Sequence, residues 1–255
     1  MTNQITATLL THDASSVDTT SWSTASITPS PNKLLLFSLI TVSPDGIPAP
    51  TVTGCGLTWE LVDQMSVSAN SRCTFIYRAM GAAPTPGPVT ATDPLNMTSA
   101  CWSVVELDGV DTSGANGSGA IVQTNAIRRT GVSSVDMSLP NPVGADNVTF
   151  GAMGCAQSTV TQVPGSGYEQ LAFDTINTPS NGLLTEWANP GLQDITCTYT
   201  GATGNPFVVG CEIQAAAPGS STLNDTKVGS TTVASAYVGS QPVSAMYVGS
   251  TQVFP

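Results

Sequence analysis

The fold class is decided by the stretch Cys73-Thr-Phe-Ile-Tyr-Arg78, in which large apolar residues alternate with polar ones. Thr58-Trp-Glu-Leu-Val-Asp63 repeats the alternation a short distance before it. A period of two residues is typical of a β-strand that buries one face. Leu34-Leu-Leu-Phe37 is apolar at every position, and we therefore expect it to lie in a central strand that is covered on both faces.

Similar short runs continue along the chain, and clusters of Gly, Pro, Asn and Ser separate them. Examples of these clusters are Ser43–Gly46, Gly81–Gly87 and Gly201–Pro206. Such residues supply the backbone angles that a chain reversal requires. No segment keeps a 3.6-residue period over ten residues, so helices are not expected. We therefore predict an all-β protein whose residues 1–213 form a jelly-roll-like antiparallel β-sandwich.

The end of the chain carries an internal repeat of ten residues. Residues 214–226 contain small residues, Pro and Gly and are predicted to be a linker, and residues 227–255 repeat Val-Gly-Ser three times in register. Each Gly-Ser pair is predicted to be a tight turn between two very short strands. Such units cannot bury an apolar face by themselves.

A partner surface must therefore cover the repeats, either the sandwich of the same chain or the same segment of other subunits. We favour the second, because homo-oligomers commonly form around a symmetry axis, and a trimeric β-prism would satisfy it. The residues predicted to make this oligomerisation or attachment contact are the repeated apolar ones. They are Val228, Val233, Tyr237, Val238, Val243, Tyr247, Val248, Val253 and Phe254.

Charge is scarce and acidic. Only 9% of the residues are charged, and 17 acidic against 6 basic residues give a net charge of -11. This balance argues against nucleic-acid binding, because neutralising phosphates requires clustered Lys and Arg. The most apolar run, residues 33–42, is too short to span a bilayer, and the first residues do not form a signal peptide, so we expect synthesis in a cytoplasm and no membrane insertion.

The six cysteines are predicted to be free thiols in the core. No two of them lie closer than 14 residues, and most lie within apolar runs such as Phe207–Ile213. A free cysteine behaves as a small buried hydrophobic residue. Zinc is not expected, because paired ligands are missing and His12 is the only histidine.

Three sets of residues could carry chemistry, and each has a simpler explanation. His12 would be the only available base, but it follows an alternating strand, where a surface histidine is ordinary. Glu169, Asp174 and Glu186, beside Tyr168 and Trp187, could cleave a glycan, which requires two carboxyls flanking a cleft. We expect instead that Tyr168 and Trp187 belong to the core and that Glu169 and Glu186 face solvent.

The third set comprises Glu106, Asp108 and Asp111, which could hold Ca²⁺ but fit a strand end and its turn better. The sequence therefore predicts no catalytic residue, no metal and no cofactor.

Three stretches together resemble surface structural proteins of tailed bacteriophages. They are Gly56–Val62 with Arg72–Gly81, Trp102–Gly114, and the Tyr-Val-Gly-Ser repeats that end in Val253-Phe-Pro255. The resemblance implies a non-enzymatic virion structural protein, a capsid decoration or cement protein on the outer head surface. The alternative that it implies is a tail fibre or adhesin that binds a host surface glycan. Partners would then be further copies in a homotrimer, and the major capsid protein or a tail protein.

Overall fold

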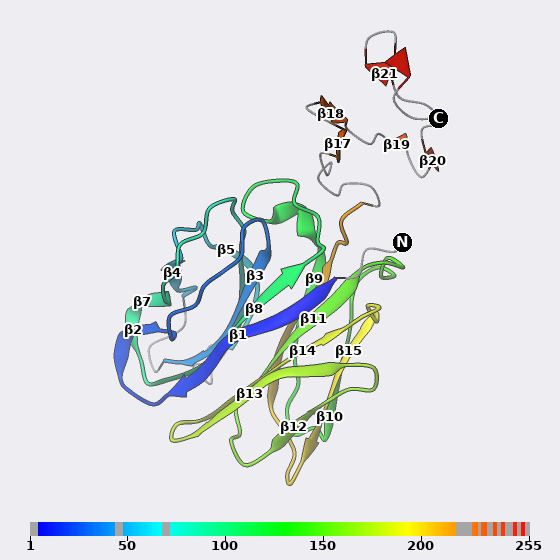
Figure 1. The fold of residues 1–255 in the computed structure, drawn as a ribbon. Coiled ribbons are helices and arrows are strands. Elements are labelled where there is room, and N and C mark those ends of the chain that lie inside the picture. The colour runs from blue at the N-terminus through cyan, green and yellow to red at the C-terminus, as the bar shows by residue number, and fades with distance from the viewer. Residues whose placement is uncertain are drawn as a thin grey trace. The chain divides into compact units, whose positions relative to one another are not determined.

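The computed structural model describes residues 5–43, 48–67 and 72–217, together with short strands between residues 226 and 252. The chain divides into two units (Figure 1). One is the compact body Gln4–Ala215, and the other contains the residues from Ala216 onward with the first three residues of the chain. The first two residues of the predicted linker, Gln214 and Ala215, thus belong to the compact body.

The compact body consists of two β-sandwiches that follow one another in the chain. The first sandwich contains a five-stranded sheet in the order β1-β8-β3-β6-β5 and a three-stranded sheet in the order β2-β7-β4. All strand pairs in both sheets are antiparallel. Its strands are β1 (Thr6–Ser15), β2 (Thr19–Ser23), β3 (Leu34–Val42), β4 (Thr51–Gly54), β5 (Glu60–Val67), β6 (Arg72–Ala79), β7 (Val89–Met97) and β8 (Ser99–Asp108).

The second sandwich repeats this arrangement strand for strand. Its five-stranded sheet has the order β13-β14-β11-β16-β9, and its three-stranded sheet has the order β10-β15-β12. A short 3-10 turn, η2 (Ser118–Ala120), precedes it. Its strands are β9 (Ile121–Arg128), β10 (Ser134–Ser138), β11 (Val148–Cys155), β12 (Thr161–Pro164), β13 (Glu169–Asn177), β14 (Ser180–Ala188), β15 (Asp194–Thr200) and β16 (Pro206–Ile213).

Replacing β1–β8 by β9–β16 in order converts the sheets of the first sandwich into those of the second. Eight antiparallel strands in which the first pairs with the eighth, and the eighth with the third, make a jelly-roll-like sandwich. The all-β prediction is therefore confirmed. The number of sandwiches differs, because residues 1–213 were expected to form one and the structure forms two.

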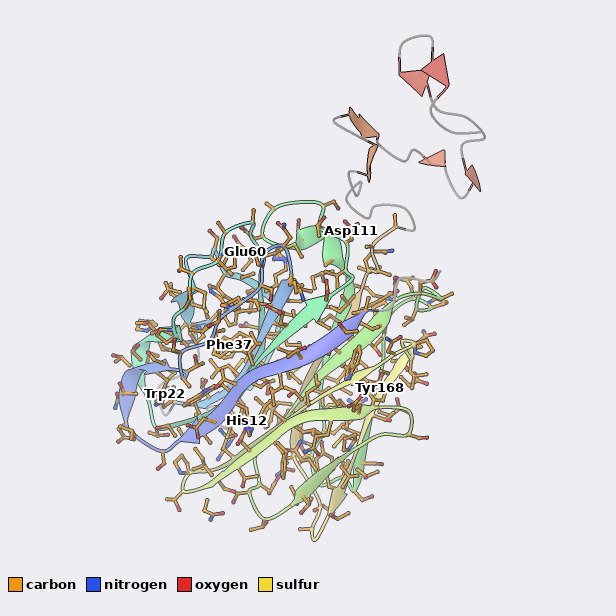
Figure 2. All side chains as sticks on the ribbon, in the orientation of Figure 1. His12, Trp22, Phe37, Glu60, Asp111 and Tyr168 are labelled. Atoms are coloured by element: carbon orange, nitrogen blue, oxygen red, sulfur yellow. The ribbon has the colours of Figure 1, made fainter. Side chains whose placement is uncertain are left out.

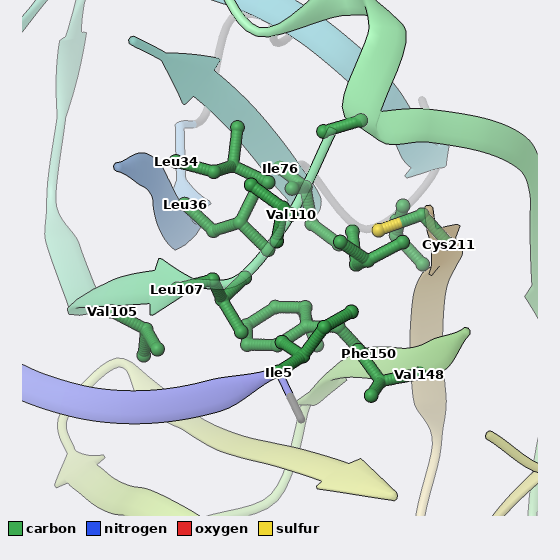
Figure 3. Packing of buried hydrophobic residues seen from close by; sticks show 14 of the residues in the cluster. Ile5, Leu34, Leu36, Ile76, Val105, Leu107, Val110, Val148, Phe150 and Cys211 are labelled. Atoms are coloured by element: carbon green, nitrogen blue, oxygen red, sulfur yellow. The ribbon is translucent and has the colours of Figure 1, made fainter. Parts of the chain in front are cut away.

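Three apolar layers hold the body together. One fills the first sandwich and includes Phe37 and Phe75, and another fills the second and includes Met153 and Leu184. The third lies between the two five-stranded sheets, where Leu36 of β3 and Phe150 of β11 belong to the same cluster (Figure 3). The four sheets are thus stacked so that both five-stranded sheets are covered on both faces.

This stacking explains the strands that are apolar throughout. All nine residues of β3 are buried, and so are all eight of β11 and of β16. The prediction that Leu34–Phe37 lies in a central strand is confirmed, because β3 is the middle strand of its sheet. Among the described residues, no helix is long or apolar enough to cross a membrane.

The second unit contains three short hairpins. They pair β17 (Thr226–Val228) with β18 (Thr231–Val233), β19 (Tyr237–Val238) with β20 (Gln241–Pro242), and β21 (Tyr247–Val248) with β22 (Thr251–Gln252). In the first hairpin Val228 pairs with Thr231, which leaves two residues between them. The predicted Gly-Ser turns themselves lie outside the described residues.

Candidate functional site

The hairpins contain most of the residues predicted for oligomerisation or attachment. Val228 ends β17 and Val233 ends β18, while Tyr237 and Val238 form β19 and Tyr247 and Val248 form β21. Val243, Val253 and Phe254 lie outside the described residues.

The register of the three hairpins repeats with the sequence. Val228 pairs with Thr231, Val238 with Gln241 and Val248 with Thr251, so each hairpin places a valine at its last paired position. Equivalent positions that recur every ten residues would allow each of the three hairpins to make the same contact with a partner.

His12 joins the two sandwiches. His12 lies on β1 (Figure 2), and its Nδ1 lies 2.8 Å from Oδ2 of Asp174 on β13 of the second sandwich. The histidine side chain is 44% exposed. The contact is a partly exposed one between neighbouring strands, and His12 lies within β1 and not after a strand as expected.

The three carboxylates considered for glycan cleavage occupy three separate environments. Glu169 is exposed on β13, Asp174 is bound to His12, and Glu186 of β14 is completely buried. The expectation that Glu186 faces solvent is therefore wrong. It fails because Glu186 lies on the same face of β14 as Leu184, which packs inside the second sandwich, while Trp187 lies on the opposite face.

Glu186 lies inside the second sandwich against Gly151, its partner on β11. Burial raises the pKa of this carboxyl to about 9, and the nearby backbone N–H of Gly165 acts in the opposite direction. At neutral pH the side chain is therefore an uncharged acid inside an apolar core.

The two aromatic residues beside these carboxylates are half-buried rather than fully in the core. The Tyr168 hydroxyl lies 3.0 Å from Thr149 Oγ1, and Trp187 packs against the layer between the sandwiches. Both rings are thus occupied by contacts within the fold.

Glu106 and Asp108 are two of the three residues that were considered as Ca²⁺ ligands, and in the structure they anchor a loop. Glu106 Oε2 accepts a hydrogen bond from the backbone N–H of Ser30 at 2.6 Å, and Oε1 accepts one from the Ser30 hydroxyl at 3.0 Å. Lys33 Nζ lies 3.1 Å from Asp108 and 3.9 Å from Glu106.

Asp111 Oδ1 accepts the N–H of Ser113 at 2.7 Å, which closes the turn after the strand. No group of His, Cys, Asp or Glu arranged to hold a metal occurs in the part of the chain that the structure describes.

Glu212 was not singled out by the sequence, but it plays the same part in the second sandwich. It is 1% exposed, and its oxygens accept hydrogen bonds from Gly144 N–H at 2.7 Å, Asn147 Nδ2 at 2.6 Å and Gln123 Nε2 at 2.6 Å. The available signal was a single glutamate within the apolar run Phe207–Ile213, since a buried charge requires partners.

All six cysteines are buried and free, as predicted. Burial raises the pKa of every thiol, to about 12 for Cys197 and Cys211. They act as core residues.

Comparison with known protein families, curated proteins and solved structures finds no match to this chain. The hairpins are the candidate site because their register repeats with the ten-residue period of the sequence.

Proposed function

We propose that this chain is a non-enzymatic virion structural protein, a decoration or cement protein on the outer surface of a capsid. The observation that carries the proposal is the array of three hairpins that follows a compact body. Each strand in the array is two or three residues long, and an isolated hairpin of that length is not stable in water. The array thus needs a surface to pair with.

The proposed partners are the hairpins of other copies, in a homotrimer, and the major capsid protein. Three equivalent positions in one chain, multiplied by three chains, would build a continuous β-prism around a symmetry axis. The body Gln4–Ala215 would then be the part displayed at the surface. A net charge of -11 would keep decorated particles apart in solution.

The first test is the oligomeric state of the full chain and of a Val238→Asp variant in sedimentation equilibrium. We expect a trimer for the full chain and a monomer for the variant. Gln241→Asp is the matched control, because Gln241 is the partner of Val238 in the same hairpin and the variant adds the same charge without removing an apolar side chain. A full chain that is monomeric, or a Val238→Asp variant that remains trimeric, would contradict the role of the hairpins.

The second test locates the protein by antibody labelling of intact particles in the electron microscope. Even labelling of heads is the expected result. Labelling confined to tails would instead support a tail fibre or adhesin, and saturable, sugar-inhibitable binding to host cells would then be measured. Particles without label would overturn the virion assignment.

A further inference from the structure

The two sandwiches match in residue register as well as in strand order. Leu34 of β3 pairs with Leu107 of β8, and Val148 of β11 pairs with Ile213 of β16. Aligning these pairs places Glu106 on Glu212. Glu106 accepts a hydrogen bond from the backbone N–H of Ser30, four residues before Leu34. Glu212 accepts one from the backbone N–H of Gly144, four residues before Val148. Two buried glutamates thus perform the same task at the same position.

The bulges in β5 and β13 agree with this alignment, whereas those in the other two edge strands, β1 and β9, lie two residues apart on it. The pairing of β5 with β6 skips Val62, and the pairing of β13 with β14 skips Leu171. Each bulge comes two residues after a glutamate, Glu60 or Glu169, that pairs with the neighbouring strand. A bulge is a specific feature of a fold, and its recurrence at one position marks the sandwiches as two versions of one unit.

The contact between the two five-stranded sheets is symmetric under exchange of the sandwiches. β1 lies beside β13 and its counterpart β9 lies beside β5, while β8 contacts β13 and β14 as β16 contacts β5 and β6. The layer is therefore arranged around an approximate two-fold axis. This is the geometry of an isologous dimer, in which the same surface of both partners meets itself.

The chemistry of the layer is that of an interface. Its centre is apolar, with a buried hydrogen bond at 3.2 Å between the hydroxyls of Ser103 and Thr185. At its edges Arg72 Nη2 donates to Ser180 O at 2.9 Å, and His12 meets Asp174. An apolar centre with polar contacts around it is the usual anatomy of a surface that binds another protein.

We infer that each five-stranded sheet is a recognition surface for a second sandwich of the same kind, so that the two halves of this chain bind each other without the connector between β8 and β9. The inference is independent of the proposed function, because it concerns the body Gln4–Ala215 and the hairpins take no part in it.

The test starts from the full chain with a protease site inserted between Gly114 and Ala115, in the exposed part of the connector. After cleavage we expect both fragments to sediment together at micromolar concentration. The fragments are then separated in urea, refolded apart and mixed. We expect each to refold and to bind the other at one to one, with a dissociation constant below about 1 µM, as in standard protein interfaces.

Gly154→Leu is the disruptive variant. A Cβ on Gly154 would collide with Thr74 Oγ1 and lie 2.8 Å from Ile40 Cδ1, both across the interface. We expect binding of the fragments to weaken by about a hundredfold or more. Gly87→Leu is the matched control, because a Cβ there meets nothing within 4 Å, and it should leave binding unchanged.

A second, milder variant keeps the inference testable if the Gly154→Leu variant does not fold. His12→Ala with Arg72→Ala removes the two polar contacts described above and should weaken binding by about fivefold. Fragments that separate at micromolar concentration would overturn the inference. So would a fragment that stays unfolded until the other is added, because the layer would then be part of a single shared core. The hairpins cannot mimic the expected result, since the fragment that ends at Gly114 lacks them.

Discussion

The two sandwiches share a strand order and fill it with different side chains. The core of the first is dominated by rings, which are those of Trp22, Phe37, Trp59, Phe75, Tyr77 and Trp102. The core of the second contains mainly Met, Leu, Ile and Val. Where β3 has Phe37, the matching position of β11 is Gly151, and where β6 has Tyr77, β14 has Glu186.

The second core compensates for its missing rings from the opposite sheet. Ile195 of β15 approaches both Gly151 and Gly210, and a Cβ on either glycine would collide with it. One branched side chain thus fills the space that two strands leave open. The comparison teaches that this strand order depends on the total volume enclosed and not on particular residues at matching positions.

The largest loss of stability is expected when an aromatic ring is removed from the core of the first sandwich. Phe75 and Leu184 occupy the same register position, and both are fully buried. We expect Phe75→Ala to lower the free energy of unfolding by about 4 kcal/mol and Leu184→Ala by about 3 kcal/mol. The ring loses more because Phe75 also packs on Tyr77, at 6.1 Å between ring centroids. Urea unfolding measures both, and a larger loss for Leu184→Ala would show that the second core is the tighter one.

The second prediction concerns Glu186, which has no acidic counterpart in the first sandwich. Its pKa is about 9 in the folded chain and near 4.5 when unfolded, so folding retains a proton that the unfolded chain loses. The free energy of unfolding should therefore fall as the pH rises from about 4.5 to about 9.

Glu186→Gln removes this titration. At pH 8 the variant should be more stable than the natural chain by about 5 kcal/mol, and at pH 4 the two should be nearly equal. Thermal unfolding across this range measures the difference. Glu169→Gln, an exposed change on the neighbouring strand, is the control. A natural chain that is equally or more stable than the Gln variant at pH 8 would contradict the prediction.

The third prediction separates the two matching glutamates. Glu212→Ala removes an acceptor shared by three donors, one of them on the buried Asn147, and should cost about 3 kcal/mol. Glu106→Ala should cost about 1 kcal/mol, because Ser30 is half-buried and can reach water, while Lys33 keeps Asp108. Denaturant unfolding of both variants gives the ratio, and equal losses would show that the two loops are anchored equally.

The smallest effect is expected where the sandwiches meet at the surface. His12→Ala should change the free energy of unfolding by less than about 1 kcal/mol, because the pair with Asp174 is partly exposed. Adding salt should reduce the difference between the natural chain and the variant. A salt-independent loss would indicate that packing of the imidazole matters more than its charge.

Much of the fold could be predicted from local patterns. The unbroken apolar run Leu34–Phe37 identifies a central strand, and the ten-residue period identifies the hairpins. The alternation in Cys73–Arg78 correctly predicts a strand, but β6 is buried on both faces and not on one. These signals depend on neighbours in the chain, and so they are visible without the structure.

The duplication and the burial of Glu186 could not be predicted in the same way. Matching positions hold residues as different as Phe37 and Gly151, so the two halves do not align by eye. The expectation that Glu186 faces water fails because it shares with Leu184 the face of β14 that packs inside the second sandwich, while Trp187 lies on the face toward the layer between the sandwiches. Both features depend on how distant segments pack.

The buried thiols have a consequence for the surroundings in which this chain can exist. Oxidants and disulfides react with the thiolate, and in all six cysteines burial raises the pKa and shields the sulfur. The folded body therefore needs no oxidation step to mature, and it does not cross-link to its neighbours when reducing conditions are lost. A change from reducing to oxidising solution should therefore leave the covalent structure of the body unchanged.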